Sequence, residues 1–167
     1  MHGELLDATV LAAFAGTAAA IDIATRRIPN AVPLALTMVG VTLAATGVTG
    51  ITPASSALGI AAGLLLMLPG HLFGATGAGD VKLFAAAGSV LGAGQMFEAF
   101  VAVAVAGGVL ALAVAWRRGR IGRTVAGAVQ CARGPREAKA EIESPLRDNR
   151  FAYGPAVAVG CIVAALI

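Results

Sequence analysis

The sequence is poor in charged residues, with only 13% of its 167 residues Asp, Glu, Lys or Arg, against about 25% in ordinary soluble domains. Aromatic residues are also scarce, at 5%, and two cysteines are too few for a disulfide scaffold. So little charge could not solvate the surface of a soluble globular protein of this size. A disordered chain is excluded as well, because 58% of the residues are hydrophobic. With a mean hydropathy of +0.86, the composition predicts an integral membrane protein.

The longest uncharged run determines how the chain must cross a membrane. Between Arg27 and Asp80 lie 52 residues without Asp, Glu, Lys or Arg. As one helix this run would be about 78 Å long, whereas the hydrocarbon core is about 30 Å thick, so the run must cross twice. Its turn-forming residues 46–53 mark the reversal. The same test predicts an all-α, polytopic protein with one membrane domain, 1–167, and six transmembrane helices: 6–25, 31–48, 54–73, 80–94, 97–116 and 151–167.

The basic residues predict the orientation of these helices. All twelve Lys and Arg fall in three places: Arg26 and Arg27, Lys82, and the stretch 117–150. With six spans, these places are the first, third and fifth connections, which lie on one side of the membrane. By the positive-inside rule this side is cytoplasmic, and both termini are external. The opposite side is expected to carry three solvated acids: Glu4, Asp7 and Glu98.

The basic cytoplasmic connection 117–150 has two interpretations. In the first, Ile121, Val125 and Val129 lie on one face of an amphipathic helix that rests on an anionic inner leaflet. In the second, the segment is a solvated connector between two spans. Nucleic-acid binding is not expected, because the membrane topology already explains the positive charge and no aromatic residues are interleaved with it.

Two carboxylates lie at the cytoplasmic ends of apolar spans, Asp22 and Asp80. A charged acid there costs about 2.5–3.5 kcal/mol, so each predicts a functional site. Each also has a structural interpretation: Asp22 could pair with Arg26 one helical turn later, and Asp80 could be the N-cap of the fourth span.

Taken together, the two acids indicate a catalytic function. Both are expected near the cytoplasmic ends of their spans, so they can converge from different helices. A facing pair shares one proton, and one protonated and one ionised carboxyl are what aspartic proteolysis requires. No Ser–His, Cys–His or metal-binding pattern competes, and His71 is interpreted as an interfacial residue.

Three motifs resemble those of the type IV prepilin peptidases, which are polytopic aspartic proteases of the Gly-x-Gly-Asp class. They are Asp22 followed by the hairpin 26–30, the run Gly77-x-Gly79-Asp80-x-Lys82, and the segment 151–156. The resemblance implies that Asp22 and Asp80 are the catalytic pair and that Gly77 and Gly79 belong to the active-site loop. It also implies a substrate or loop role for these residues: Arg26, Pro29, Asn30, Lys82, Tyr153, Gly154 and Pro155. Lys82 is expected to face lipid headgroups or the substrate.

The resemblance further implies a substrate and a location. Family members remove the basic leader of prepilins at the cytoplasmic face of the bacterial inner membrane. The expected partners are therefore a prepilin, membrane lipids and the pilus assembly machinery, with no cofactor and no metal. Larger members have a zinc-binding domain with two CxxC pairs and methylate the new pilin terminus. Here neither Cys131 nor Cys161 belongs to such a pair, which predicts a peptidase without methyltransferase activity, similar to those of tight-adherence (Flp-type) systems.

The residues alone leave two other functions open: a small ion- or proton-coupled transporter and a non-catalytic pilus-assembly protein.

Two further expectations concern the roles of the two aspartates and the shape of the third span. Helix dipoles favour Asp80 as the base and Asp22 as the acid, although Arg26 acts in the opposite direction on Asp22. Pro69 and Gly70 are expected to kink or break the third span.

Overall fold

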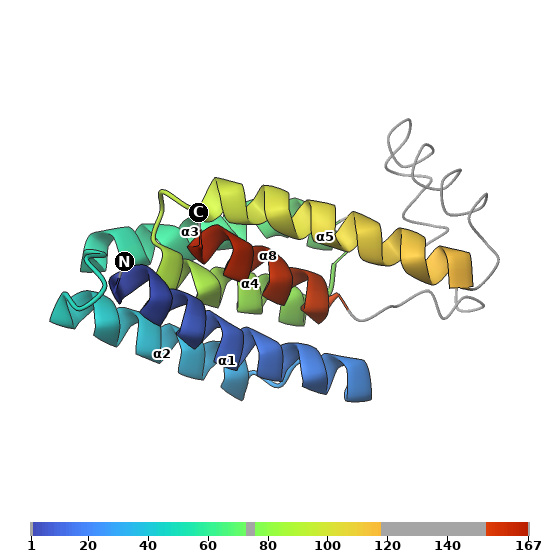
Figure 1. The fold of residues 1–167 in the computed structure, drawn as a ribbon, viewed down its shortest axis with the longest axis horizontal. Helices are drawn as coiled ribbons and strands as arrows, with labels where there is room; N and C mark the ends of the chain where they lie inside the picture. Colours follow the sequence, from blue (N-terminus) through green and yellow to red (C-terminus); the bar gives the residue numbers. More distant parts are fainter. Residues whose placement is uncertain (1, 73–75, 118–152, 167) are drawn as a thin grey trace.

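The fold is seen in a computed structural model, which describes residues 2–72, 76–117 and 153–166. These residues form α-helices and turns, and no strand occurs among them. The helices are α1 (His2–Thr25), α2 (Ala31–Thr46), α3 (Pro53–Leu72), α4 (Ala78–Leu91), α5 (Met96–Arg117) and α8 (Gly154–Ala165). Successive helices run in opposite directions along one bundle axis (Figure 1). The expected all-α fold is confirmed.

Three of the helices are long and apolar enough to cross a membrane: Leu5–Thr25, Pro53–Leu72 and Met96–Arg117. The helices α2 and α8 are apolar but shorter, with 16 and 12 residues. The 14 residues of α4 extend only about 21 Å, less than the hydrocarbon core of about 30 Å. This helix begins at Ala78, two residues before the expected fourth span.

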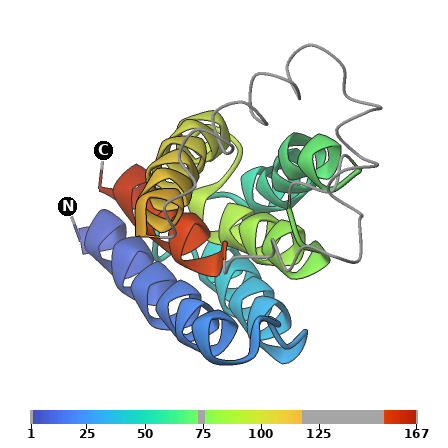
Figure 2. The ribbon, with the colours of Figure 1, turned by 90° about the vertical axis from the view of Figure 1, so that its right-hand side faces the viewer.

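The short helix α4 lies at the centre of the bundle. Apart from Ala78, Gly79 and Lys82, all of its residues are buried. Viewed end-on, α4 has α2 and α3 beside it, and α8 lies between α1 and α5 (Figure 2). Because neighbouring helices cover α4 on all sides, lipid does not determine its length.

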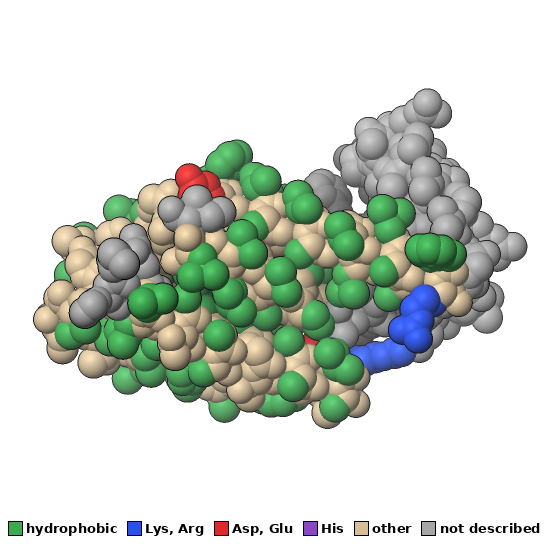
Figure 3. Space-filling view, viewed as in Figure 1, with side chains coloured by type: hydrophobic (Ala, Val, Ile, Leu, Met, Phe, Trp, Pro, Cys, Tyr) green, Lys and Arg blue, Asp and Glu red, His purple; other side chains and the backbone are tan. Residues whose placement is uncertain are grey.

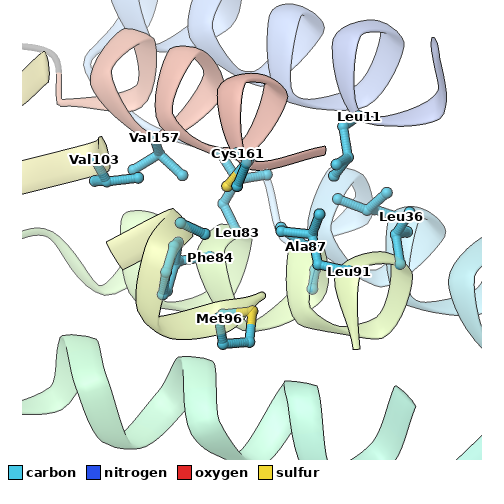
Figure 4. Packing of buried hydrophobic residues seen from close by; sticks show 14 of the residues in the cluster. Leu11, Leu36, Leu83, Phe84, Ala87, Leu91, Met96, Val103, Val157 and Cys161 are labelled. Carbon is cyan, nitrogen blue, oxygen red and sulfur yellow. The ribbon is translucent and has the colours of Figure 1, made fainter. Parts of the chain in front are cut away.

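Large apolar side chains from several of these helices fill the core (Figure 4). Leu11 of α1 and Leu36 of α2 pack beside Ala87 and Leu91 of α4. Nearer the other end of α4, the Phe84 ring meets Phe100 of α5 edge-on, with ring centroids 6.4 Å apart.

Small residues set how closely α4 approaches α3. A Cβ on Gly59 would overlap the backbone of Gly88, and a Cβ on Gly88 would overlap that of Gly59. Beside this crossing, the buried Ser56 hydroxyl donates a 2.9 Å hydrogen bond to the Ser89 carbonyl oxygen. Small-residue contacts and interhelical hydrogen bonds are typical of helix packing in lipid. They hold α4 in one register against α3.

One end of the bundle carries the positive charge. We call it the basic end: α1, α3 and α5 finish there, and α2, α4 and α8 begin there. The described Lys and Arg residues, which all belong to this end, are Arg26, Arg27, Lys82 and Arg117. In Figure 3, blue side chains gather at that end, while apolar side chains cover the flanks of the bundle. The rest of the connection 117–150, including Cys131, lies outside the described residues.

Asp7 corrects one expectation from the sequence. We expected a solvated acid on the outer face, but Asp7 is only 9% exposed. Its Oδ1 atom is buried and has no hydrogen-bond partner among the described residues. The physical reason is its helical position, because Asp7 lies one turn before the fully buried Leu11 and shares its inward face.

Candidate active site

Asp22 lies in the last turn of α1, on the face that packs into the bundle. The buried positions Leu11, Ala15 and Ala18 precede it at helical spacing, and Asp22 itself is 6% exposed. Its Oδ2 atom accepts a 2.9 Å hydrogen bond from the backbone N–H of Gly154. Gly154 is the first residue of α8, so the carboxylate sits at the N-terminus of a second helix.

A side chain at residue 154 would crowd this contact. A Cβ on Gly154 would lie 2.9 Å from the Asp22 Oδ2 atom and 3.1 Å from its Cβ. The next residue, Pro155, suits the first turn of α8, where its missing N–H would have no helical partner. Gly154, one of the residues expected at the site, thus lies directly against Asp22.

Asp80 lies in the first turn of α4 and is 7% exposed. Its Oδ2 atom accepts a 3.0 Å hydrogen bond from the N–H of Gly77, which is the N-cap residue. The structural interpretation of Asp80 as the N-cap was therefore wrong. Asp80 occupies the third helical position, from which an acidic side chain reaches back to the cap N–H.

The two carboxylates lie near each other at the basic end of the bundle. They are close enough for the charge of Asp22 to act on Asp80. Two like charges in such a site cannot both ionise without an energetic cost, so the pair favours a state that shares one proton. This arrangement can hold a proton donor and a proton acceptor side by side.

The hairpin between α1 and α2 packs against the loop that carries Asp80. A Cβ on Gly79 would lie 3.1 Å from the Ile28 Cβ, which leaves little room for a larger residue. Lys82 is exposed, and its Nζ atom donates a 3.0 Å hydrogen bond to Oδ1 of Asn30. Asn30 is the N-cap residue of α2, so this bond joins two helix beginnings. Pro29 is exposed beside it.

Arg26 ends the helix that carries Asp22. The helix α1 ends at Thr25, and Arg26 has a φ of 53°, in the left-handed region. Its backbone N–H still donates a 2.7 Å hydrogen bond to the carbonyl oxygen of Asp22, one turn earlier, and its side chain is exposed. The ion pair between Arg26 and Asp22 stays a prediction.

Tyr153 connects the Asp80 side of the site to α5. Its ring lies over Gly107, where a Cβ would be 2.5 Å from the phenol oxygen. The side chain is half-buried, and the negative charge of Asp80 acts on it. Gly107 is not among the residues expected at the site from the sequence. In an apolar helix, no sequence pattern shows which glycine contacts an aromatic ring from a distant segment.

A short tether between α3 and α4 was also missed. The Nδ1 atom of His71 donates a 3.0 Å hydrogen bond to the carbonyl oxygen of Thr76, directly before Gly77. The Thr76 N–H in turn donates a 3.3 Å hydrogen bond to the Gly70 carbonyl oxygen. His71 is exposed, as an interfacial residue would be, but this bond also gives it a structural role. The helix α3 continues through Pro69 to Leu72 and is not broken at Pro69.

A cavity of about 370 Å³ lies beside the site, between α3 and α5. Apolar side chains form most of its wall, and Thr76 and Tyr153 are its polar members. Residues of α3 in the wall are Leu65, Leu66, Met67, Pro69 and Gly70, and those of α5 are Phe100, Val103 and Ala104. Among the residues placed by the structure, no group of three or more His, Cys, Asp or Glu could hold a metal ion.

Comparison with known proteins identifies the family. The type IV leader peptidase family matches residues 9–112, a region that contains both aspartates and the Gly-x-Gly-Asp run. No curated protein and no solved structure matches the chain. The matched region covers more than half of the sequence. The chain therefore belongs to the type IV leader peptidase family, so it is a membrane protease and its substrate is a prepilin.

Proposed function

We propose that this chain is an aspartic endopeptidase in which Asp22 and Asp80 are the catalytic residues. One observation carries the proposal: two buried carboxylates from different helices lie near each other at the basic end, and each is held by a glycine N–H. Two acids close enough to act on each other are suited to general acid–base chemistry.

The proposed reaction needs only these two groups and water. The ionised carboxylate takes a proton from a water molecule, whose oxygen attacks the carbonyl carbon of the scissile peptide bond. The protonated carboxyl donates a hydrogen bond to the carbonyl oxygen and stabilises the tetrahedral intermediate. When this intermediate collapses, the carbon–nitrogen bond breaks and the leaving amine takes a proton. The products are a leader with a new carboxyl end and a pilin with a new amino end.

Helix dipoles do not determine which aspartate is the base and which is the acid. Asp80 lies at the positive N-terminus of α4, as expected. Asp22 lies at the C-terminus of α1 but also accepts the hydrogen bond from the N-terminus of α8. Since both carboxylates contact a helix N-terminus, the difference expected from α1 alone is reduced.

The charge distribution supports a cytoplasmic active site in the bacterial inner membrane. Arg26, Arg27, Lys82 and Arg117 share the end of the bundle at which Asp22 and Asp80 lie. The positive-inside rule places that end in the cytoplasm and both chain ends outside. A prepilin would then present its basic leader to the cytoplasm and its apolar segment to the membrane.

We also propose that the substrate is an Flp-type prepilin and that the enzyme does not methylate it. The support is that neither Cys131 nor Cys161 belongs to a CxxC pair. The mass of the mature pilin tests this point after cleavage by the purified enzyme with S-adenosylmethionine present. An unmodified amino terminus is expected, and an added methyl group would contradict the proposal.

Co-expression with a tagged prepilin tests the catalytic assignment against the two other functions. Asp22→Asn and Asp80→Asn should each lower leader removal by at least about 100-fold, because each removes one acid–base group. Asp7→Asn is the matched control, since it neutralises a third buried acid, at the opposite end of α1. Wild-type processing by either Asp22→Asn or Asp80→Asn would favour a non-catalytic or transport role for the acids.

A further inference from the structure

The cavity between α3 and α5 shares its wall with the catalytic loop. Thr76 directly precedes Gly77, whose N–H binds Asp80, and Tyr153 directly precedes Gly154, whose N–H binds Asp22. The cavity therefore lies next to the residues whose N–H groups hold the two aspartates. Its volume of about 370 Å³ is near the lower end of the range of about 300–1,000 Å³ for ligand sites.

From the level of the aspartates, the cavity extends away from the basic end of the bundle. Tyr153 packs on Gly107 of α5, and two other wall residues, Val103 and Phe100, lie one and two turns further along that helix. Seven helical residues correspond to about 10 Å. Phe100 also meets Phe84, which lies one turn past Asp80 on α4. A group in this cavity would thus lie on the membrane side of the catalytic pair.

The chemistry of the wall points to a peptide with a large apolar side chain. Almost all of the lining is aliphatic or aromatic, so a charged or strongly polar group would lose its hydration there without compensation. The polar members are Thr76 and Tyr153, and the Oγ1 atom of Thr76 is buried and makes no hydrogen bond to a described residue. A peptide backbone can supply that missing partner, whereas the acyl chain of a lipid cannot.

We propose that this cavity binds a large apolar side chain of the prepilin, on the membrane side of the scissile bond. It thereby sets the position at which the leader is cut. The proposal rests on the catalytic role of Asp22 and Asp80 proposed above. It makes Ala104, at the wall of the cavity, a residue that determines specificity rather than a catalytic residue.

The inference is tested with the purified full-length enzyme by enlarging a residue of the cavity wall and shortening residues of the substrate. Ala104→Leu fills part of the cavity, and Ala113→Leu is the control, since Ala113 is exposed on the same helix but not in the cavity wall. The substrates are a tagged prepilin and a series in which each large apolar residue after the cleavage site is changed to alanine. Ala104→Leu should lower kcat/KM for the parent prepilin by about 10-fold or more, and one alanine substrate should restore it.

Two results would overturn the inference. One is an Ala104→Leu enzyme that cuts all substrates as the Ala113→Leu enzyme does, and the other is an equal loss for every substrate, as expected if a lipid chain fills the cavity. A second measurement does not depend on filling the cavity. A photoreactive residue placed after the cleavage site should cross-link to α3 or α5 near Leu66 or Val103, and its failure to do so would also contradict the site. If Asp22→Asn and Asp80→Asn lack activity while these tests fail, only the cavity assignment is wrong.

Discussion

Gly154 allows the first turn of α8 to lie directly against Asp22, so it acts on the site through backbone geometry. We predict that Gly154→Ala lowers cleavage by about 10- to 100-fold, because a displacement of about 1 Å is enough for such a loss. Its added Cβ would lie 2.9 Å from the Asp22 Oδ2 atom. Gly108→Ala is the control, since no atom lies within 4 Å of its added Cβ. Activity is compared at equal amounts of folded protein, and full activity of Gly154→Ala would show that α8 does not position Asp22.

Asp7 is the second residue whose effect can be measured alone. It is buried on α1 with an unpartnered oxygen, and a buried polar group without a hydrogen bond costs about 1–3 kcal/mol. Asp7→Leu should therefore raise the unfolding temperature of the purified protein in detergent, with cleavage unchanged. A lower unfolding temperature would mean that the carboxylate has a stabilising partner.

At the scale of elements, the tether between α3 and α4 holds Thr76, in the loop that precedes Asp80. His71→Leu removes the hydrogen bond to the Thr76 carbonyl oxygen, which contributes about 0.5–1.5 kcal/mol. We predict a loss of cleavage of about 3- to 10-fold for His71→Leu. His71→Asn keeps a side-chain donor and should retain more of the activity. Equal rates for the wild type and both variants would show that the tether does not affect the loop.

Element boundaries also show what could be predicted from the sequence. Uncharged runs and turn residues located all six described helices to within a few residues, because only helices can satisfy the backbone in lipid. They did not predict the central place of α4, since it depends on helix contacts such as Gly59 with Gly88. Asp7 was misjudged for a similar reason, because its place on the outer side of the predicted topology was taken to mean exposure.

The candidate site, too, could be predicted only in part from the sequence. Asp22 and Asp80 were identified as a pair from the scarcity of acids in apolar segments. Their partners could not be found in this way, because the contacts of Gly154 with Asp22 and of Tyr153 with Gly107 join residues far apart in the chain. Family motifs indicated Gly154 and Tyr153 as site residues, but the contacts they make come only from the fold.

At the scale of the whole molecule, the bundle has a basic end and apolar flanks, as expected of a protein oriented by its charges. We predict that a reporter inserted after residue 130 gives a cytoplasmic signal. A single cysteine at Thr49, in a cysteine-free background, should react with a membrane-impermeant reagent from outside, because the turn between α2 and α3 lies at the opposite end. Labelling of Thr49→Cys only after the membrane is broken would reverse the proposed orientation.

The central claim is that Asp22 and Asp80 act as one catalytic unit, and the double variant tests it most directly. The initial rate of prepilin cleavage is measured for the wild type, for Asp22→Asn, for Asp80→Asn and for the two changes together. Residues that act as a unit have non-additive effects, so the double variant should be no slower than either single variant. Losses that multiply in the double variant, or wild-type cleavage by either single variant, would contradict a shared acid–base mechanism.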